Sequence, residues 1–210
     1  AGGPHAQDRG LEAVAYAYGE MSSVPSAARW EKPQGKNPPL VMEKRFDIVG
    51  RGVALVIGCG TFPTWNTYPG LFAALVTGNP VIVKPHPNAI LPAAISVRIV
   101  RDALAENGID PNLVSLAVTS DPKATQALAT NPSVRSIDFT GSSSFGHWLI
   151  DNARQAQVYA ELAGVNNVVI ESTDNYKAML KNLAFTLSLY SGQMCTTTQD
   201  LFVPASGIDT

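Results

Sequence analysis

Short apolar runs alternate with amphipathic segments from Gly52 onward, and this alternation limits the fold more than any other feature of the sequence. Runs of this length, rich in valine and isoleucine, are typical of buried strands, and the amphipathic segments between them are typical of helices. Strands separated by helices favour a parallel sheet that helices cover on both faces. The sequence therefore predicts an α/β domain with strands at Val53–Ile57, Val81–Val83, Leu113–Val118 and Val134–Phe139.

Two of the intervening helices carry clear end signals. The first has Pro92 in its first turn, and Asn107-Gly108 follows it as a left-handed C-cap. The second begins with Asp121 as its N-cap and Pro122 at the first helical position. Because such sheets bind ligands beyond the carboxyl ends of their strands, the residues just after each strand are the first candidates for a functional site.

Two regions with weaker secondary-structure patterns flank this run of strands and helices. Residues 1–45 are interpreted as a helical and loop lead-in, with a helix at Glu12–Glu20 and a Pro-, Gly- and Lys-rich run at Pro33–Pro39 that we expect to hold no regular element. A boundary near Gly164 divides a first domain, residues 1–163, from the beginning of a second, residues 164–210. The second domain is expected to be truncated, because the chain stops soon after a strand. Beyond the four strands above, the expected elements are a strand at Val158–Leu162, a strand at Val168–Ile170, a helix at Tyr176–Tyr190 and a strand at Leu201–Val203.

Composition excludes several classes of function. The chain of 210 residues has 15 Lys and Arg against 17 Asp and Glu, and these charges are scattered, so we expect no nucleic-acid or membrane-surface partner. No apolar stretch approaches the roughly 20 residues that cross a bilayer, and no signal peptide is evident, which indicates the cytoplasm. Cys59 and Cys195 are expected to be two thiols, and the three histidines lack metal-ligand spacing. A small molecule is the expected partner.

A Gly- and Ser-rich turn follows the strand that ends at Phe139. It runs from Thr140 to Gly146 and opens a helix whose backbone N–H groups could face a pyrophosphate, although a plain helix cap explains the turn equally well. His147 and Trp148 replace the Lys and Ser or Thr of a P-loop, so ATP chemistry is not indicated. Lys84, at the end of another strand, could reach a ribose or phosphate, and a solvated strand-end lysine is the alternative.

Three further residues could carry chemistry. Cys195 lies just past a helix among polar residues, where a thiolate could be stabilised, and an inert buried cysteine is the alternative. Glu161 ends an apolar strand, where partial burial would suit a general base, and an edge carboxylate is the alternative. Asn66 could donate its amide to an oxyanion or could be only a turn residue, and Cys59 is expected to be a small buried packing residue.

The order and spacing of these features resemble the aldehyde dehydrogenase superfamily from about Gly52 to Val203. The matching segments are Pro63-Thr64-Trp65-Asn66, Thr77-Gly78-Asn79 leading into Val81-Ile82-Val83-Lys84-Pro85, Phe139-Thr140-Gly141-Ser142, Glu161-Leu162-Ala163-Gly164 and Gly192-Gln193-Met194-Cys195. The resemblance implies a Rossmann-like sheet, the aldehyde dehydrogenase fold, followed by the start of a second α/β catalytic domain. It also implies an NAD or NADP cofactor, an aldehyde substrate, and a homo-oligomer when the protein has its full length.

Residue roles follow from that resemblance. Cys195 would be the nucleophile, Glu161 the general base, and Asn66 with the Cys195 backbone N–H the oxyanion hole. The cofactor would be held by Lys84 at a ribose, by Gly141 and Ser142 near the pyrophosphate, and by Phe62, Trp65, Pro85 and His86.

Three features refine the resemblance. Ala163 replaces the first glycine of the usual Leu-Gly-Gly after the glutamate. Pro87 stands where many NAD-preferring relatives have a glutamate that binds both ribose hydroxyls, so we expect NADP to be accepted at least as well as NAD. The segments Trp65–Pro69 and Ser191–Thr197 are most similar to the branch that takes part in phenylacetic acid degradation, called PaaN, which implies a ring-derived semialdehyde and a possible coenzyme A thioester.

Two other interpretations stay open at this point. A non-catalytic nucleotide-binding homologue would keep the fold without the reaction. Acyl transfer, or reduction of an acyl thioester, would use the same Cys195 but would have less need of a base at Glu161.

Overall fold

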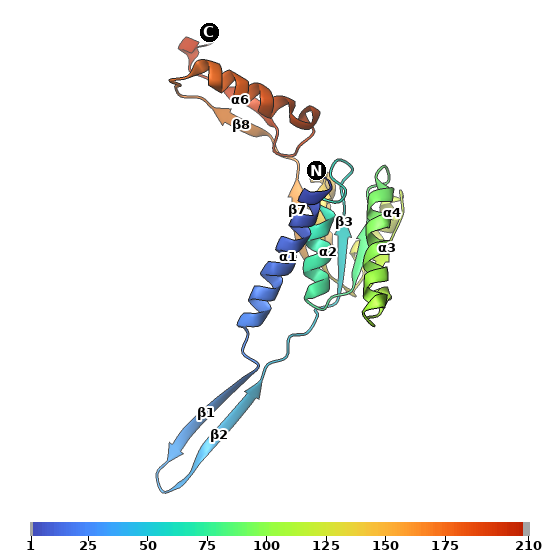
Figure 1. The fold of residues 1–210 in the computed structure, drawn as a ribbon, viewed down its shortest axis with the longest axis vertical. Coiled ribbons are helices and arrows are strands. Elements are labelled where there is room, and N and C mark those ends of the chain that lie inside the picture. Colours follow the sequence, from blue (N-terminus) through green and yellow to red (C-terminus); the bar gives the residue numbers. More distant parts are fainter. Residues whose placement is uncertain (1, 208–210) are drawn as a thin grey trace.

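A five-stranded parallel sheet forms the centre of the computed structural model, which describes residues 2–207. The strands lie in the order β5-β4-β3-β6-β7, and each neighbouring pair is parallel. The first strand of this sheet, β3, lies in its middle. The chain then adds β4 and β5 on one side and crosses over to add β6 and β7 on the other (Figure 1). Their bounds are β3 Val53–Ile57, β4 Val81–Lys84, β5 Val114–Leu116, β6 Val134–Gly141 and β7 Gln157–Leu162.

Helices cover both faces of this sheet. Alternate residues of β3 face opposite sides, so Ala54 and Val56 pack under α2 and α3, whereas Leu55 and Ile57 pack under α4 and α5. Leu55 is fully buried, and burial of a side chain of this size contributes about 1.5–3 kcal/mol. The four helices are α2 Thr67–Val76, α3 Ile90–Glu106, α4 Pro122–Ala129 and α5 Ser143–Asn152, with a 3-10 turn η1 at Pro111–Leu113. The expected α/β fold with a doubly covered parallel sheet is confirmed.

The predicted helix ends are also confirmed. After α3 the chain turns through Gly108, whose φ of 71° lies in the left-handed region. Asp121 caps α4 by accepting a hydrogen bond from the backbone N–H of Lys123 at 2.9 Å, and Pro122 is the first helical residue. These two helix ends lie on either side of β5, so they limit where that strand can begin and end.

The expectation that Pro33–Pro39 holds no regular element is wrong. Helix α1, Pro4–Ser23, leads into an antiparallel hairpin of β1, Ala27–Gln34, and β2, Asn37–Arg45, which projects from the sheet domain (Figure 1). The strand register shifts at Pro33, and the chain turns at Gly35 with a φ of 62°. A two-stranded ribbon leaves one edge of each strand unpaired, so prolines can occupy positions that donate no ladder hydrogen bond.

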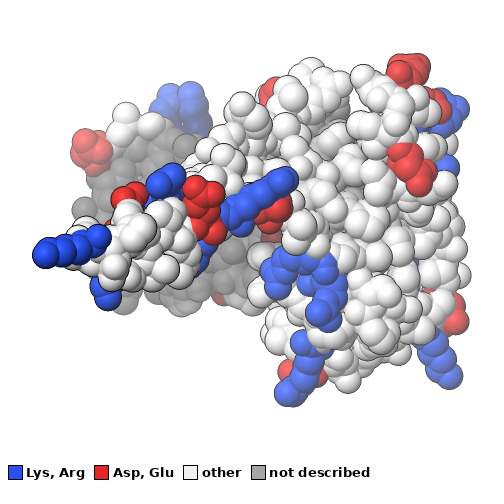
Figure 2. All heavy atoms as spheres, turned by 90° about the horizontal axis from the view of Figure 1, so that it is seen from below, with Lys and Arg blue, Asp and Glu red and all other residues white. Residues whose placement is uncertain are grey.

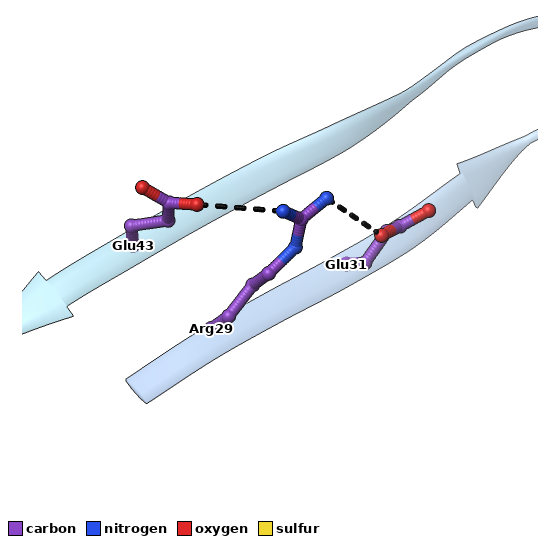
Figure 3. Close-up of polar contacts among 3 residues, drawn as sticks. All are labelled: Arg29, Glu31 and Glu43. Carbon is purple, nitrogen blue, oxygen red and sulfur yellow. Dashed lines mark hydrogen bonds and ion pairs between the residues drawn. The ribbon is translucent and has the colours of Figure 1, made fainter. Parts of the chain in front are cut away.

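Charged side chains on the hairpin pair with one another. Arg29 donates hydrogen bonds to Glu43 across the hairpin at 3.4 Å and to Glu31 on its own strand at 3.3 Å (Figure 3). All three side chains are exposed, so these ion pairs contribute little to stability. Seen from the hairpin end, basic and acidic side chains are mixed on the surface (Figure 2).

A separate βαβ unit follows β7. Strand β8, Asn166–Val169, pairs in parallel with β9, Thr198–Phe202, and helix α6, Tyr176–Ser188, connects them. This unit lies at the end of the molecule opposite the hairpin (Figure 1). Two 3-10 turns complete the described elements, η2 at Leu189–Gly192 and η3 at Ala205–Gly207. Within residues 2–207 no helix has both the length and the apolar character that a bilayer-spanning segment requires.

Candidate active site

A cavity of about 410 Å³ opens where the carboxyl ends of β3 and β6 lie side by side. The strand order reverses between these two strands, and the crevice at such a reversal is where doubly wound sheets bind ligands. Ile57 and Phe139 supply part of the apolar lining, and Thr125 of α4 adds a hydroxyl. The candidate cofactor residues that line this cavity are Lys84, His86, Gly141 and Ser142.

Lys84 is the last residue of β4 and is only 7% exposed. Burial lowers the pKa of its ammonium group. Its side chain makes no hydrogen bond or ion pair with another described residue, so a ribose hydroxyl or a phosphate oxygen would meet an unpaired donor. His86 lines the same cavity, and its Nδ1 accepts the backbone N–H of Asn88 at 3.2 Å.

The N-terminus of α5 faces the same cavity. Ser142 is the N-cap in an extended conformation, and its side chain makes no capping hydrogen bond. The first backbone N–H groups of α5 therefore remain available to an anion, which the helix dipole also favours. A Cβ at Gly141 would lie 2.7 Å from the Phe139 ring, so only glycine fits there. These features fit the pyrophosphate of a dinucleotide.

A second cavity, of about 290 Å³, adjoins the first and contains Cys195, Glu161 and Asn66. Asn66 Nδ2 donates a hydrogen bond to Glu161 Oε2 at 3.3 Å, although the two residues are 95 positions apart in the sequence. The three side chains also line a third, neighbouring cavity of about 510 Å³. The structure therefore brings the expected nucleophile, base and oxyanion donor to one place. The residues that line both the first and the second cavity are Cys59, Thr140 and Gly141.

A tight backbone reversal presents Cys195. Tyr190, Ser191 and Gly192 all have positive φ, at 50°, 58° and 69°, which turns the chain back after α6. For the two residues that carry a Cβ, such a conformation costs about 1–3 kcal/mol each and is typical of functional sites. The thiol of Cys195 is exposed toward the cavity, as an attacking nucleophile requires.

Asn166 is a residue of this site that the sequence analysis missed. Its Nδ2 donates to the backbone carbonyls of Cys195 at 2.6 Å and Thr197 at 3.0 Å, and so it fixes the segment that carries Cys195. The only available signal was the polar pair Asn166-Asn167 at the start of an expected apolar strand.

Some expectations about single residues are wrong. Glu161 is exposed rather than partly buried, because β7 is an edge strand of the sheet. Cys59 is half-buried, and its thiol is hydrogen-bonded to Asn66 rather than packed in the core. Phe62 and Trp65 line the cavities with Cys195 and not the first cavity, and Pro85 is buried and lines none of the three. Their assignment to the cofactor stays a prediction.

Comparisons with known proteins identify the family and the fold. The family model described as the aldehyde dehydrogenase family matches residues 12–210. The chain is similar to the crystal structure of an NAD-dependent aldehyde dehydrogenase from Burkholderia multivorans, with 63% sequence identity and a TM-score of 0.94. The match covers 98% of this chain and 37% of that one. The glyceraldehyde-3-phosphate dehydrogenase of Methanocaldococcus jannaschii, solved with NADP, has a TM-score of 0.75 at 20% identity, which shows a common fold; 96% of this chain and 42% of that chain are covered.

Among curated proteins, alpha-ketoglutaric semialdehyde dehydrogenase 2 of Azospirillum brasilense is 32% identical over 180 residues. The match covers 81% of this chain and 34% of the relative. The chain therefore spans about a third of the length of the proteins that it resembles.

Proposed function

The chain belongs to the aldehyde dehydrogenase family, and from that membership we propose that the whole protein oxidises an aldehyde to an acid with NAD or NADP. The observation that carries the proposal is the meeting of Cys195, Glu161 and Asn66 in one cavity that shares a wall with the cavity of Lys84. A nucleophile next to a dinucleotide site is the arrangement that hydride removal from a covalently held aldehyde needs.

The side chains divide the reaction between them. The Cys195 thiolate adds to the aldehyde carbonyl, and the resulting oxyanion accepts hydrogen bonds from the Asn66 amide and the Cys195 backbone N–H. The cofactor, when bound, supplies the hydride acceptor. Loss of hydride from the thiohemiacetal carbon leaves a Cys195 thioester. Glu161 then takes a proton from the water that attacks this thioester, and the acid leaves as the thiolate returns.

Cofactor binding and attack on the aldehyde use different parts of the chain. We place the cofactor on residues 1–163 and assign residues 164–210 to the beginning of the catalytic domain. In support, the five-stranded sheet ends at Leu162 and a separate sheet begins at Asn166. Cys195 therefore approaches the cofactor from a different domain than Asn66 and Glu161.

The protein is proposed to accept NADP at least as well as NAD. Pro87 provides no carboxylate to repel a 2'-phosphate, and Lys84 and His86 line the cofactor cavity. The name of the Burkholderia relative, an NAD-dependent enzyme, favours NAD instead. The ratio of kcat/KM for the two cofactors decides between them: a clear preference for NAD would overturn the NADP proposal and leave the dehydrogenase proposal intact.

A finer proposal concerns the substrate. Similarity of the segments Trp65–Pro69 and Ser191–Thr197 to the PaaN branch supports a semialdehyde from an opened aromatic ring, carried as a coenzyme A thioester, in phenylacetic acid degradation. We also place the protein in the cytoplasm, as a homo-oligomer. The projecting hairpin supports self-association, because Trp30, Leu40 and Met42 are each about half exposed on it.

The test is cofactor reduction by the full-length protein with a panel of aliphatic and aromatic aldehydes and semialdehydes, beside Cys195→Ala. Aldehyde-dependent reduction that disappears in the variant would support the proposal. Cofactor binding without reduction by any aldehyde would overturn it in favour of a non-catalytic homologue, and acyl transfer to coenzyme A without reduction would favour the transferase alternative.

A further inference from the structure

Cys59 has no role in the reaction as proposed, yet its thiol is tied to the oxyanion donor. Its Sγ–H donates to Asn66 Oδ1 at 3.4 Å, and Sγ accepts the backbone N–H of Phe62 at 3.4 Å. The hydroxyl of Thr61 lies 3.7 Å from the same sulfur. The thiol thus joins the loop after β3 to the side chain of Asn66.

These contacts fix which way the Asn66 amide points. With Oδ1 against the thiol hydrogen, Nδ2 faces Glu161 Oε2 at 3.3 Å. Rotation of the amide by half a turn would place Oδ1 against the Glu161 carboxylate and Nδ2 against the thiol. The contact of Oδ1 with the carboxylate would be repulsive, and Oδ1 would lose the hydrogen bond from the thiol, although the sulfur is a weak acceptor for Nδ2. Glu161 therefore disfavours the rotated amide, and Cys59 stabilises the observed one through its hydrogen bond to Oδ1. That orientation keeps N–H donors, rather than a carbonyl oxygen, directed at the cavity of Cys195.

The loop holds Cys59 in place through close backbone packing on either side. A Cβ at Gly58 would lie 2.8 Å from the hydroxyl of buried Thr67, the first residue of α2 after Asn66. A Cβ at Gly60 would lie 3.1 Å from the His86 ring. Gly58 thus packs closely against the start of α2 and Gly60 lies near the exposed His86 ring, so the loop that carries Cys59 has little room to shift relative to Asn66.

We propose that Cys59 is a positioning residue that orients the Asn66 amide as the oxyanion donor. The inference rests on the proposed function, since Asn66 acts on an oxyanion only when a carbonyl is attacked. A thiol is a weak donor, so Cys59→Ala should lower kcat about tenfold, less than the loss of a direct oxyanion donor. The KM for the cofactor should stay within about twofold, because positioning affects the reacting centre rather than cofactor binding. Cys59→Ser keeps a donor and an acceptor and should recover most of the activity.

The experiment uses the full-length protein with Cys59→Ala, Cys59→Ser, Asn66→Ala and the double variant Cys59→Ala/Asn66→Ala. Each is assayed for aldehyde oxidation and for hydrolysis of p-nitrophenyl acetate, which needs the thiol and the oxyanion donor but no cofactor. If Cys59 acts through Asn66, Cys59→Ala should change kcat less than about twofold once Asn66 is alanine. Thermal unfolding of every variant measures any effect on folding separately.

The inference is overturned if Cys59→Ala equals the unmodified protein, if serine does not restore activity, or if the loss is the same with and without Asn66. Ester hydrolysis with the expected pattern but no aldehyde oxidation would support the inference and overturn the proposed function. Absence of both activities would overturn both.

Discussion

The sheet domain and the βαβ unit that follows it contribute to one site, but they are stabilised differently. The sheet domain has two apolar clusters, one on each face of the sheet, whose buried members lie between Ala54 and Ala153. After Ala153 no apolar side chain of the described residues is buried, and Val169, Phe185 and Phe202 are each more than half exposed. The first region therefore fixes the proposed cofactor residues and Asn66 through its own packing. The second holds Cys195 mainly through hydrogen bonds, in a chain about a third as long as its relatives.

Removal of the nucleophile should have the largest effect and should separate the two regions. Cys195→Ala should lower aldehyde-dependent cofactor reduction about 10⁴-fold or more, because no thiohemiacetal can form. Cofactor binding by the same variant should be unchanged, since Lys84 and the N-terminus of α5 belong to the sheet domain. Steady-state kinetics and equilibrium titration with NADP measure the two effects. Activity within tenfold of normal would place the nucleophile on another residue.

Loss of the proposed base should slow thioester hydrolysis but not the steps before it. Glu161→Gln should lower steady-state turnover about 10²–10⁴-fold, because the thioester is no longer hydrolysed efficiently. The first turnover should survive, since thiol addition and hydride loss do not need water. Rapid mixing should then show a burst of reduced cofactor close to one equivalent per site. A burst that is lost together with turnover would show that Glu161 also acts before thioester formation.

The sheet domain could be predicted from the sequence because its signals are local. Strand runs, the caps at Gly108 and Asp121, and the glycine turn after Phe139 each have one simple structural solution. The hairpin was not predicted because prolines usually exclude a strand, and the sequence does not show that these lie in a two-stranded ribbon with unpaired edges. Exposure of Glu161 was missed because the sequence does not state that β7 is an edge strand.

The site was less accessible to prediction than the fold. Only the order of several motifs supported catalytic roles for Cys195, Glu161 and Asn66, since each residue taken alone has a common structural explanation. Asn166 and Cys59 act through hydrogen bonds to residues that are distant in the sequence or joined through a loop, and no periodicity reports such contacts.

Asn166 tests how firmly the second region holds the nucleophile. Asn166→Ala removes both hydrogen bonds to the backbone around Cys195, and should lower kcat about tenfold by allowing the thiol to leave its reactive position. Alkylation of Cys195 by iodoacetamide should change less than turnover does, because the thiol remains exposed. The neighbouring Asn167→Ala is the matched control. Equal activity of both variants would mean that other parts of the protein position this segment.

Asp138 offers the smallest effect on activity and a test of the sheet domain alone. Burial, with a smaller contribution from the charge of Glu161, raises the pKa of Asp138 from 3.8 to about 6. The carboxylate lies where a Cβ at Gly70 would clash, in a cavity that Arg51 and Tyr159 also line.

A carboxyl pKa raised in the folded state means that the folded protein binds the proton more tightly than the unfolded chain does. The stability from Asp138 is therefore fully present below pH 3.8 and is lost as the pH rises through about 6. Asp138→Asn keeps the shape without the charge and should raise the free energy of unfolding at pH 8 by up to about 3 kcal/mol. At pH 4 the difference should be much smaller.

Denaturant unfolding of the full-length protein at both pH values measures this difference, with the exposed Asp151→Asn as control. Because Asp138 touches neither the cofactor cavity nor the cavity of Cys195, cofactor binding should stay within about twofold. Equal stabilisation at pH 4 and pH 8 would show that the asparagine acts by packing rather than by removal of a buried charge. A stabilising effect confined to high pH would show that the buried charge of Asp138 destabilises the sheet domain itself, outside the cavities of the proposed site.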